Sequence, residues 1–349
     1  MSSGFWHGKK VFITGHTGFK GAWLTSMLLD MGARVTGYSL PPPTSPNLFE
    51  LLHLSNKITH IEGDIRNRSQ VMETVRDAKP DILFHLAAQA LVRESYANPL
   101  DTFDTNTIGT LNILEATRYC STLRSCVIVT TDKCYLNNEA GSFFKETDAL
   151  GGKDPYSASK AAAEIICHAY YESFLKQTHI PMATARAGNV IGGGDWAKDR
   201  LIPDVFRAFL ASKPVLIRNP AATRPWQHVL EPLRGYMLLA EKLFTAGHVF
   251  AGAWNFGPQP SGIQSVEYVL SGLKKILPFD LQLDRAPQPE EAKTLALDIH
   301  KASEKLGWTP CLNLDQTVQW TAEWYSGFAH KSSPAELTRK QISDYWRLA

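Results

Sequence analysis

The chain has 349 residues, of which 44% are hydrophobic and 20% are charged, so it can form one large globular domain with an appendage or two domains. Its formal net charge of +2 argues against nucleic acid and membrane surfaces as partners, because both require a strong basic field. No apolar run approaches the roughly 18 residues of a membrane span, and residues 1–10 lack the apolar core of a signal peptide.

The cysteines favour a cytoplasmic protein. There are five of them, an odd number, without the paired spacing of a zinc site: Cys120, Cys126, Cys134, Cys167 and Cys311. We therefore expect free thiols in a reducing compartment and no bound metal.

Short β-branched runs alternate with longer helical patterns through the first half of the chain, which predicts an α/β fold with a Rossmann-type doubly wound parallel sheet. The predicted strands are Lys9–Thr14, Arg34–Tyr38, Ile58–Glu62, Ile82–Leu86, Ser125–Thr130 and Met182–Ala187. The predicted helices between them are Gly21–Met31, Ser69–Ala78, Leu100–Tyr119 and Tyr156–Gln177. We expect surplus apolar surface on the last two helices to build the interface of a homodimer or homotetramer.

The pattern changes after Ala187, where glycines and prolines become frequent, as in irregular structure laid over a scaffold. The apolar run Leu233–Leu243 should return as a helix to the first domain, and short helical patterns follow at Val266–Ile276 and Thr317–Tyr325. We therefore predict a first domain over 1–187, to which about 224–256 return, and a smaller mixed α/β lobe over 188–223 and 257–349.

A glycine-rich segment lies where the first predicted strand passes into the first predicted helix: Gly15-His16-Thr17-Gly18-Phe19-Lys20-Gly21. Glycines at such a turn let the backbone approach a pyrophosphate and place it at the positive end of the helix. A turn of this kind can also simply connect a strand to a helix, without binding a ligand. As a dinucleotide site, it would contribute cofactor contacts from Gly15, Thr17, Gly18, Phe19, Lys20 and Gly21.

The end of the second predicted strand carries no carboxylate, although the dinucleotide fingerprint has an acidic residue there for the ribose hydroxyl of NAD. Ser39 can bind the ribose instead, but only as a neutral group. No arginine follows that would receive the 2′-phosphate of NADP, and Arg34 lies at the far end of the strand. The choice between NAD and NADP stays open on these residues, with NAD favoured.

Two further strand ends carry candidate cofactor contacts. Asp64 and Ile65 follow the third predicted strand, where a carboxylate can meet an adenine amino group. Leu86-Ala87-Ala88-Gln89 closes the fourth strand with small residues that let a cofactor lie flat. In the alternative, Asp64 caps the next helix and the two alanines only pack.

The fifth predicted strand is followed by three consecutive polar residues, Thr131-Asp132-Lys133, at the carboxyl edge of the sheet where ligands bind in open α/β folds. Tyr156 and Lys160 are four residues apart and share one helix face, where the ammonium can hold the pKa of the phenol below about 10. Such a pair alone is more often a solvated face than a catalytic dyad. Together with the glycine-rich turn it indicates nicotinamide-dependent chemistry on a hydroxyl group.

Over nearly its whole length the chain resembles the extended short-chain dehydrogenase/reductase family, and within it the nucleotide-sugar 4,6-dehydratases. The matching motifs are the glycines at 15, 18 and 21, Thr131-Asp132-Lys133, Tyr156 with Lys160, Gly188-Asn189-Val190-Ile191-Gly192-Gly193-Gly194-Asp195-Trp196, Arg200-Leu201-Ile202-Pro203 and Arg224-Pro225-Trp226-Gln227-His228. Many dehydratases carry glutamate where Lys133 stands. The lysine, together with the segments 192–196 and 224–228, resembles the branch that acts on CDP-glucose. The resemblance implies a hydro-lyase with NAD as cofactor, an NAD-binding first domain and a nucleotide-sugar-binding lobe.

The resemblance also implies a reaction in three stages. Tyr156, as a phenolate assisted by Lys160, takes the proton of the sugar's 4-hydroxyl while Thr131 orients that hydroxyl. Lys133 then removes the proton at carbon 5, Asp132 protonates the departing 6-hydroxyl, and hydride finally returns to carbon 6. Asp132 and Lys133 can share one proton, so their separate roles stay open.

The substrate implied by the resemblance is CDP-glucose or a related nucleotide sugar. Arginine suits the geometry of a diphosphate, so Arg224 is expected at the phosphates, with Asn189, Arg200 and Asn255 as further contacts. Asn106 is expected to fix the backbone near the tyrosine and lysine.

These assignments have structural alternatives. Asn189 can cap a turn, Arg200 can pair with Asp199 or Asp204 on a surface, and Asn106 can be a helix-surface amide. One departure also bears on the substrate: relatives that act on dTDP-glucose have a second arginine where residues 287–291 here read Pro-Gln-Pro-Glu-Glu. This departure puts a dTDP-sugar in doubt.

Two other functions fit part of the pattern. An epimerase of the same fold would use the same cofactor and the Tyr-Lys pair without an acid and a base at positions 132 and 133. A catalytically silent dinucleotide-sensing protein would keep the fold alone, and the presence of Thr131, Tyr156 and Lys160 argues against it.

Overall fold

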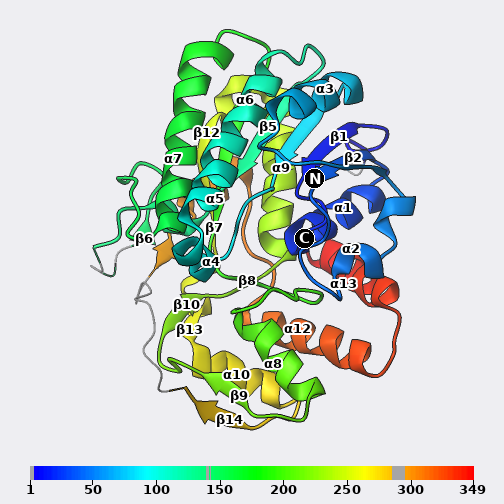
Figure 1. The fold of residues 1–349 in the computed structure, drawn as a ribbon, viewed down its shortest axis with the longest axis vertical. Helices are drawn as coiled ribbons and strands as arrows, with labels where there is room; N and C mark the ends of the chain where they lie inside the picture. Colours follow the sequence, from blue (N-terminus) through cyan, green and yellow to red (C-terminus); the bar gives the residue numbers. More distant parts are fainter. Residues whose placement is uncertain (1–3, 139–140, 142, 285–294) are drawn as a thin grey trace.

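The computed structural model describes residues 4–138, 141, 143–284 and 295–349, and its centre is a seven-stranded parallel sheet (Figure 1). The strand order is β12-β7-β5-β4-β1-β2-β3. The strands are β1 Lys10–Thr14, β2 Arg34–Ser39, β3 Thr59–Glu62, β4 Ile82–His85, β5 Ser125–Val129, β7 Met182–Ala187 and β12 Gly252–Phe256. The chain order reverses between β1 and β4, which is the position where open α/β sheets bind their ligands.

Helices cover both faces of the sheet, as the alternating sequence pattern predicts (Figure 1). The helices on one face are α3 Arg68–Ala78, α5 Pro99–Phe103, α6 Thr110–Arg118 and α7 Pro155–Tyr170. The helices on the other face are α1 Phe19–Asp30, α9 Leu230–Ala246 and α11 His300–Leu306. Short helices α2 Leu48–Leu51 and α4 Val92–Ala97 lie in the loops after β2 and β4. Because both faces are covered, every residue of β4, β5 and β7 is buried.

The second part of the molecule lies below the carboxyl ends of the strands in Figure 1. Its helices are α8 Leu201–Leu210, α10 Val266–Lys274 and α12 Leu314–Ala329. Its short strands pair β9 Val215–Ile217 with β14 Leu281–Leu283, and β10 Thr223–Pro225 with β13 Ile263–Ser265. Two more pairs form separate two-stranded sheets, β8 Val190–Ile191 with β11 Gln227–His228 and β6 Phe143–Phe144 with β15 Ala296–Leu297.

The last helix, α13 Pro334–Leu348, packs against α12 of this lobe and also against α1 and α2 of the first domain. The end of the lobe predicted over 257–349 therefore contacts both parts of the molecule. A hydrogen bond from the indole of Trp23 in α1 to the carbonyl of Gly193, at 2.9 Å, ties the first domain to the Gly-rich loop after β8. These links hold the two parts against each other around the cavity described below.

Two predicted helices are not uniform α-helix. The predicted helix 100–119 contains a π-helical turn over Asp104–Gly109 between α5 and α6, and the helix predicted to reach residue 177 continues from α7 as a π-helical turn over Tyr171–Leu175. The first of these turns contains Asn106, which is buried. Within the described ranges no helix combines the length and apolar character needed to cross a bilayer.

Candidate active site

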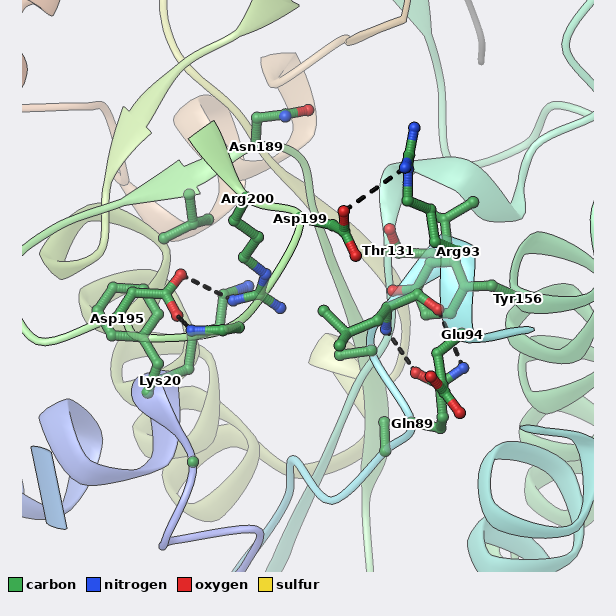
Figure 2. Close-up of a pocket in the computed structure, with 18 of the residues that line it drawn as sticks. Lys20, Gln89, Arg93, Glu94, Thr131, Tyr156, Asn189, Asp195, Asp199 and Arg200 are labelled. Atoms are coloured by element: carbon green, nitrogen blue, oxygen red, sulfur yellow. Dashed lines mark hydrogen bonds and ion pairs between the residues drawn. The ribbon is translucent and has the colours of Figure 1, made fainter. Parts of the chain in front are cut away.

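A cavity of about 2060 Å³ opens at the carboxyl ends of the sheet strands, between the sheet and the lobe (Figure 2). This volume is well above the roughly 300–1,000 Å³ typical of a site for one small molecule, so two ligands can lie side by side. The predicted site residues that line it are Gly15, Thr17, Gly18, Phe19, Lys20, Gly21, Ser39, Asp64, Ile65, Leu86, Ala87, Ala88, Gln89, Thr131, Lys133, Tyr156, Lys160, Asn189, Arg200 and Arg224. The structure does not place Asp132, Asn106 or Asn255 on the cavity wall.

The glycine-rich turn forms a cradle that larger residues would fill. Gly15 has a φ of +76°, and a Cβ there would lie 2.6 Å from the backbone nitrogen of Ala87. A Cβ on Gly21 would lie 2.1 Å from the carbonyl oxygen of Gly15. Gly18 caps α1 without a side-chain hydrogen bond, and no acidic residue follows in the first turn. The positive end of the helix therefore faces the cavity, which fits the pyrophosphate of a dinucleotide.

The tip of β2 presents a hydroxyl pair in place of a carboxylate. Ser39 and Thr17 are hydrogen-bonded through their hydroxyl oxygens at 2.8 Å, and Thr17 also donates to the carbonyl of Leu40 at 3.0 Å. Ser39 is thus held at the cavity wall by the glycine-rich turn itself. This arrangement explains how the site forms without the acidic residue of the usual fingerprint.

Asp64 lies on the cavity wall and is already engaged by Arg66, a residue that sequence reasoning did not single out. The guanidinium donates to the carboxylate at 2.8 and 2.6 Å. Burial acts to raise the pKa of Asp64, but the hydrogen bonds and charge of Arg66 prevail and hold it below its ordinary value. The cap of α3 is Asn67, so Asp64 does not have the capping role considered as its alternative.

Asn106 is fully buried and is not a helix-surface amide. Its side chain accepts from the backbone N–H of Gln89 at 2.9 Å and donates to the carbonyl of Gln89 at 3.0 Å. It also donates to the hydroxyl of Ser159 at 2.9 Å, between Tyr156 and Lys160 on α7. Asn106 therefore joins the end of the β4 loop to the helix that carries the tyrosine and lysine. Its supporting role stays a prediction.

Tyr156 and Lys160 lie one turn apart on α7, which begins at the cap Asp154. Lys160 donates to the carbonyl of Val129 at 3.1 Å, and burial lowers its pKa to about 8. The expected lowering of the tyrosine pKa is not found. Burial raises the pKa of Tyr156 to about 12, the charge of Asp132 adds to the rise, and a hydrogen bond with Thr131 opposes it.

Thr131, Asp132 and Lys133 lie at the tip of β5, where Asp132–Cys134 form a 3₁₀ turn. Thr131 donates to Oδ1 of Asp132 at 3.0 Å, and Nζ of Lys133 lies 3.6 Å from the same oxygen. Lys133 lines the cavity, whereas Asp132 is sealed behind it with no exposed surface. The other oxygen of Asp132, Oδ2, is buried without a hydrogen-bond partner among the described residues.

The facing wall comes from the segment after β7. Arg200 donates to Asp195 at 2.9 Å, not to Asp199 or Asp204, and so it stays in the cavity rather than on a surface (Figure 2). Arg224 donates to the carbonyl of Thr223 at 2.8 Å, and Arg224 and Asn189 both line the cavity.

The structure does not support the prediction that Asn255 contacts the substrate. Its amide oxygen accepts from the hydroxyl of Tyr135 at 2.8 Å, and its nitrogen donates to the carbonyls of Phe144 and Asp298 at 2.9 and 3.2 Å. With no exposed surface, it holds Tyr135 at the cavity wall instead of touching a ligand there.

Two features of the site were missed. Lys20 was assigned only as part of the turn, yet its removal from water lowers the pKa of its ammonium to about 7, and repulsion from Arg200 adds to the shift. Arg93 of α4 lies 3.6 Å from Asp199 across the cavity, as Figure 2 shows. The sequence analysis read Lys20 only as a member of the glycine-rich motif. No sequence signal connects Arg93 with Asp199, because the two residues are more than 100 positions apart.

Comparison with known proteins agrees with this geometry. A family model described as GDP-mannose 4,6 dehydratase matches residues 12–321. The chain is 43% identical to a CDP-glucose 4,6-dehydratase of Salmonella typhimurium, over 99% of this chain and 98% of the relative. It is 27% identical to a dTDP-glucose 4,6-dehydratase of Xanthomonas campestris, over 90% and 92% of the two chains. A UDP-glucuronic acid 4-epimerase from Bacillus cereus, solved with UDP-glucuronic acid and NAD, shares the fold with a TM-score of 0.78, 24% identity, and coverage of 91% of this chain and 99% of that one.

Proposed function

The chain belongs to the GDP-mannose 4,6 dehydratase family, and on that premise we propose that it is a lyase that removes water from CDP-glucose and yields CDP-4-keto-6-deoxyglucose. The observation that carries the proposal is the 43% identity with a CDP-glucose 4,6-dehydratase over 99% of the chain. The chemistry of the cavity supports it, because an acid and a base stand at the tip of β5 beside the tyrosine of α7.

NAD is the cofactor, and the residues present fit it. The cradle of Gly15, Gly18 and Gly21 would hold the pyrophosphate, Ser39 the adenosine ribose, and Asp64 the adenine. When bound, NAD supplies a temporary acceptor for the hydride of carbon 4, which ends on carbon 6.

The first proton of the reaction is that of the 4-hydroxyl. Tyr156 accepts it, and Thr131 orients the hydroxyl from the neighbouring strand tip. Lys160 is mostly protonated at neutral pH, since its pKa is about 8, and so it favours negative charge that develops on the phenol oxygen. The resulting ketone makes the hydrogen at carbon 5 acidic.

The second stage uses the pair at the tip of β5. Lys133 reaches the cavity and takes the proton from carbon 5, and Asp132 supplies the proton with which the 6-hydroxyl departs as water. An epimerase of this fold needs no such pair. The pair is therefore the feature of the site that favours dehydration over epimerisation.

We place the nucleotide diphosphate against Arg200, Arg224 and Asn189. The two guanidinium groups can bind phosphate oxygens in a bidentate manner, and their removal from bulk water strengthens the attraction. The segment 287–291, whose sequence argues against dTDP-glucose, lies outside the described residues.

We further propose that two copies of the chain associate through α5, the π-helical turn 104–109 and α7. These elements pack against one another and expose Leu100, Ile108 and Ile165, at 80%, 45% and 57% of their surfaces. Exposed apolar side chains gathered on one face are typical of a protein interface. Replacement of Ile165 by Asp should convert the dimer to a monomer in sedimentation analysis, and a parent chain that is already monomeric contradicts the interface.

The experiment that tests the proposed reaction is incubation of the purified protein with CDP-, dTDP-, GDP- and UDP-glucose, with and without added NAD. A 4-keto product from CDP-glucose, stimulated by NAD because Ser39 binds the ribose without a charge, is the expected result. A preference for another nucleotide, or an epimer without loss of water, would refute the assignment. Full activity without added NAD would contradict only the weak ribose contact.

A further inference from the structure

Lys20 places a positive charge on the cavity wall that no carboxylate pairs with. It is the second residue of α1 and lines the cavity within the glycine-rich turn. Its ammonium makes no hydrogen bond and no ion pair with another described residue, and it lies 5.9 Å from the centre of the Tyr236 ring. No acidic residue lies in the first turn of α1, so the positive end of the helix adds to the charge of the ammonium. An anion bound in the cavity would stabilise a lysine at this position.

The charged groups around Lys20 are mostly positive. Of the charges that act on Lys20, that of Arg200 is the strongest, and it repels the ammonium. Lys160 and Lys133 repel it as well, and Asp132 attracts it. Figure 2 shows Lys20 and Arg200 reaching into the same part of the cavity. A cleft lined by charges of one sign concentrates ions of the other sign, so this wall favours an anionic ligand.

Arg200 already has one partner but keeps donors for a ligand. Its Nη1 donates to Oδ2 of Asp195 at 2.9 Å, and this is its hydrogen bond among the described residues. The arginine side chain keeps 35% of its surface exposed, whereas that of Asp195 keeps 6%. Because a guanidinium has several N–H donors, the buried carboxylate orients Arg200 and leaves most of these donors unused.

A diphosphate suits the two cations. Arginine binds phosphate oxygens through its planar fork, and lysine binds them as a point charge. The proposed function supplies two diphosphates, each of them negatively charged at neutral pH. That of NAD belongs at the glycine-rich turn, which contains Lys20, and that of CDP-glucose belongs at Arg200. Lys20 thus lies where the two ligands meet.

We propose that the amino group of Lys20 and the guanidinium of Arg200 together bind a diphosphate, and that Lys20 takes up a proton as this anion binds. The inference rests on the proposed function, because NAD and CDP-glucose are the two sources of the diphosphate. The nitrogen of Lys20 gains one N–H bond, and the proton comes from the solvent. The bound anion supplies the counter-charge that the protein itself does not provide.

The titration of Lys20 makes this uptake measurable. Burial lowers the pKa of Lys20 to about 7, and repulsion from Arg200 adds to the shift. At pH 8 most of these amino groups are therefore neutral in the ligand-free protein, and a phosphate bound beside them favours the charged form. NADH and CDP-glucose have no terminal phosphate, so their own diphosphates stay ionised and release no proton in this range.

The test is calorimetric titration at pH 8 in Tris and in HEPES, whose different heats of ionisation reveal the protons taken up per ligand bound. NADH is added first, because the reduced cofactor accepts no hydride and prevents turnover. CDP-glucose is then titrated into the NADH-saturated protein. We expect an uptake of about 0.5–1 proton over the two titrations, falling toward zero at pH 6, where Lys20 is already protonated.

The step that takes up the proton identifies the anion. Uptake with NADH assigns Lys20 to the cofactor diphosphate, and uptake with CDP-glucose assigns it to the substrate diphosphate. No uptake in either titration overturns the proposal.

Three variants connect the uptake to Lys20. Lys20→Met should abolish it and weaken binding of the same ligand roughly tenfold or more at pH 7, because a charge-assisted contact is lost. Lys20→Arg should keep the affinity but take up no proton, since a guanidinium is always charged. Lys275→Met, at an exposed position, should change neither. An uptake that persists in Lys20→Met comes from another group, such as Lys160, and overturns the proposal.

If Lys20→Met does not fold, Lys20→Arg decides by itself, because an undiminished uptake in that variant also overturns the proposal. Failure of the proposed function gives a different result. The unaltered protein would then form no keto sugar from CDP-glucose, whereas failure of this inference leaves that reaction intact and removes only the proton uptake.

Discussion

The amino group of Lys133 lies 3.6 Å from the carboxylate of Asp132, yet the lysine side chain keeps 29% of its surface exposed while that of the aspartate keeps none. Two neighbouring residues at one strand tip are thus divided between the cavity and the interior. In the roles proposed above, the base for carbon 5 is the residue that lines the cavity, and the acid is the one that is kept away from water.

Replacement of Lys133 by Met is expected to leave oxidation of carbon 4 possible and to abolish loss of water. The methionine fills a similar volume, but it cannot accept the proton of carbon 5. Mass analysis of quenched reactions should show the 4-keto sugar with its 6-hydroxyl and no 6-deoxy product. Normal dehydration by this variant refutes the role of Lys133.

A buried ion pair supports the same wall of the site. Glu164 of α7 accepts from Arg186 of β7 at 2.7 Å and from Thr184 at 2.8 Å, and Arg186 in turn donates to the hydroxyl of Tyr135 at 2.6 Å. Replacement of Glu164 by Gln leaves the guanidinium buried without its counter-charge. We expect a loss of about 3–5 kcal/mol in the free energy of unfolding, measured by denaturant titration.

The matched control for this prediction is Glu172→Gln. Glu172 pairs with Lys176 at 2.7 Å on the surface, where water screens the charges, and its replacement should leave the unfolding curve almost unchanged. Equal effects of the two substitutions would show that the buried pair has no special contribution.

The strands and the glycine cradle were predictable from the sequence, and several side-chain placements were not. Runs such as Ser125–Val129 are β-branched and bounded by turns, so each predicted sheet strand lies within two residues of the observed one. The helix α13 also has a local signal, a Ser333 cap followed by Pro334, but the pattern of apolar residues alone did not reveal it.

Which side of a strand tip faces the ligand is a tertiary property. Asp132 and Asn255 follow or occupy strand ends, and both are buried in the interior. Asn255 is held there by Tyr135, which is distant in sequence, and Oδ2 of Asp132 lies where a side chain at Gly188 would otherwise be. The raised pKa of Tyr156 has the same origin, because burial depends on elements that no local motif specifies.

Asn106 offers a test of the supporting network. Its replacement by Ala leaves the backbone N–H of Gln89 without a partner inside the protein, which should cost about 1–3 kcal/mol of stability. Because Gln89 lines the cavity, the affinity for NAD should fall as well, measured by calorimetric titration. Asn56→Ala, at an exposed amide, is the control, and unchanged NAD binding by Asn106→Ala contradicts the supporting role.

The stability of the nucleotide-free protein should depend on Lys20 in a pH-dependent way. Burial lowers the pKa of Lys20 from 10.5 to about 7, so the folded state binds its proton less tightly than the unfolded state. The penalty is complete below about pH 7 and disappears as the pH rises to 10.5. Lys20→Met should therefore raise the melting temperature most below pH 7, and progressively less above it.

Lys275→Met, at an exposed position, controls for the loss of one positive charge. A melting temperature of Lys20→Met that exceeds that of the parent by the same margin at every pH would contradict the shifted pKa.

The central claim is that hydrogen moves from carbon 4 to carbon 6 of one sugar as water departs. The most direct measurement uses CDP-glucose with deuterium at carbon 4, added NAD, and analysis of the product by mass and proton resonance. The account predicts a 4-keto-6-deoxy sugar that has lost one water and carries the deuterium on its new methyl group. A product that retains all its oxygen, with the deuterium still on carbon 4, would contradict it.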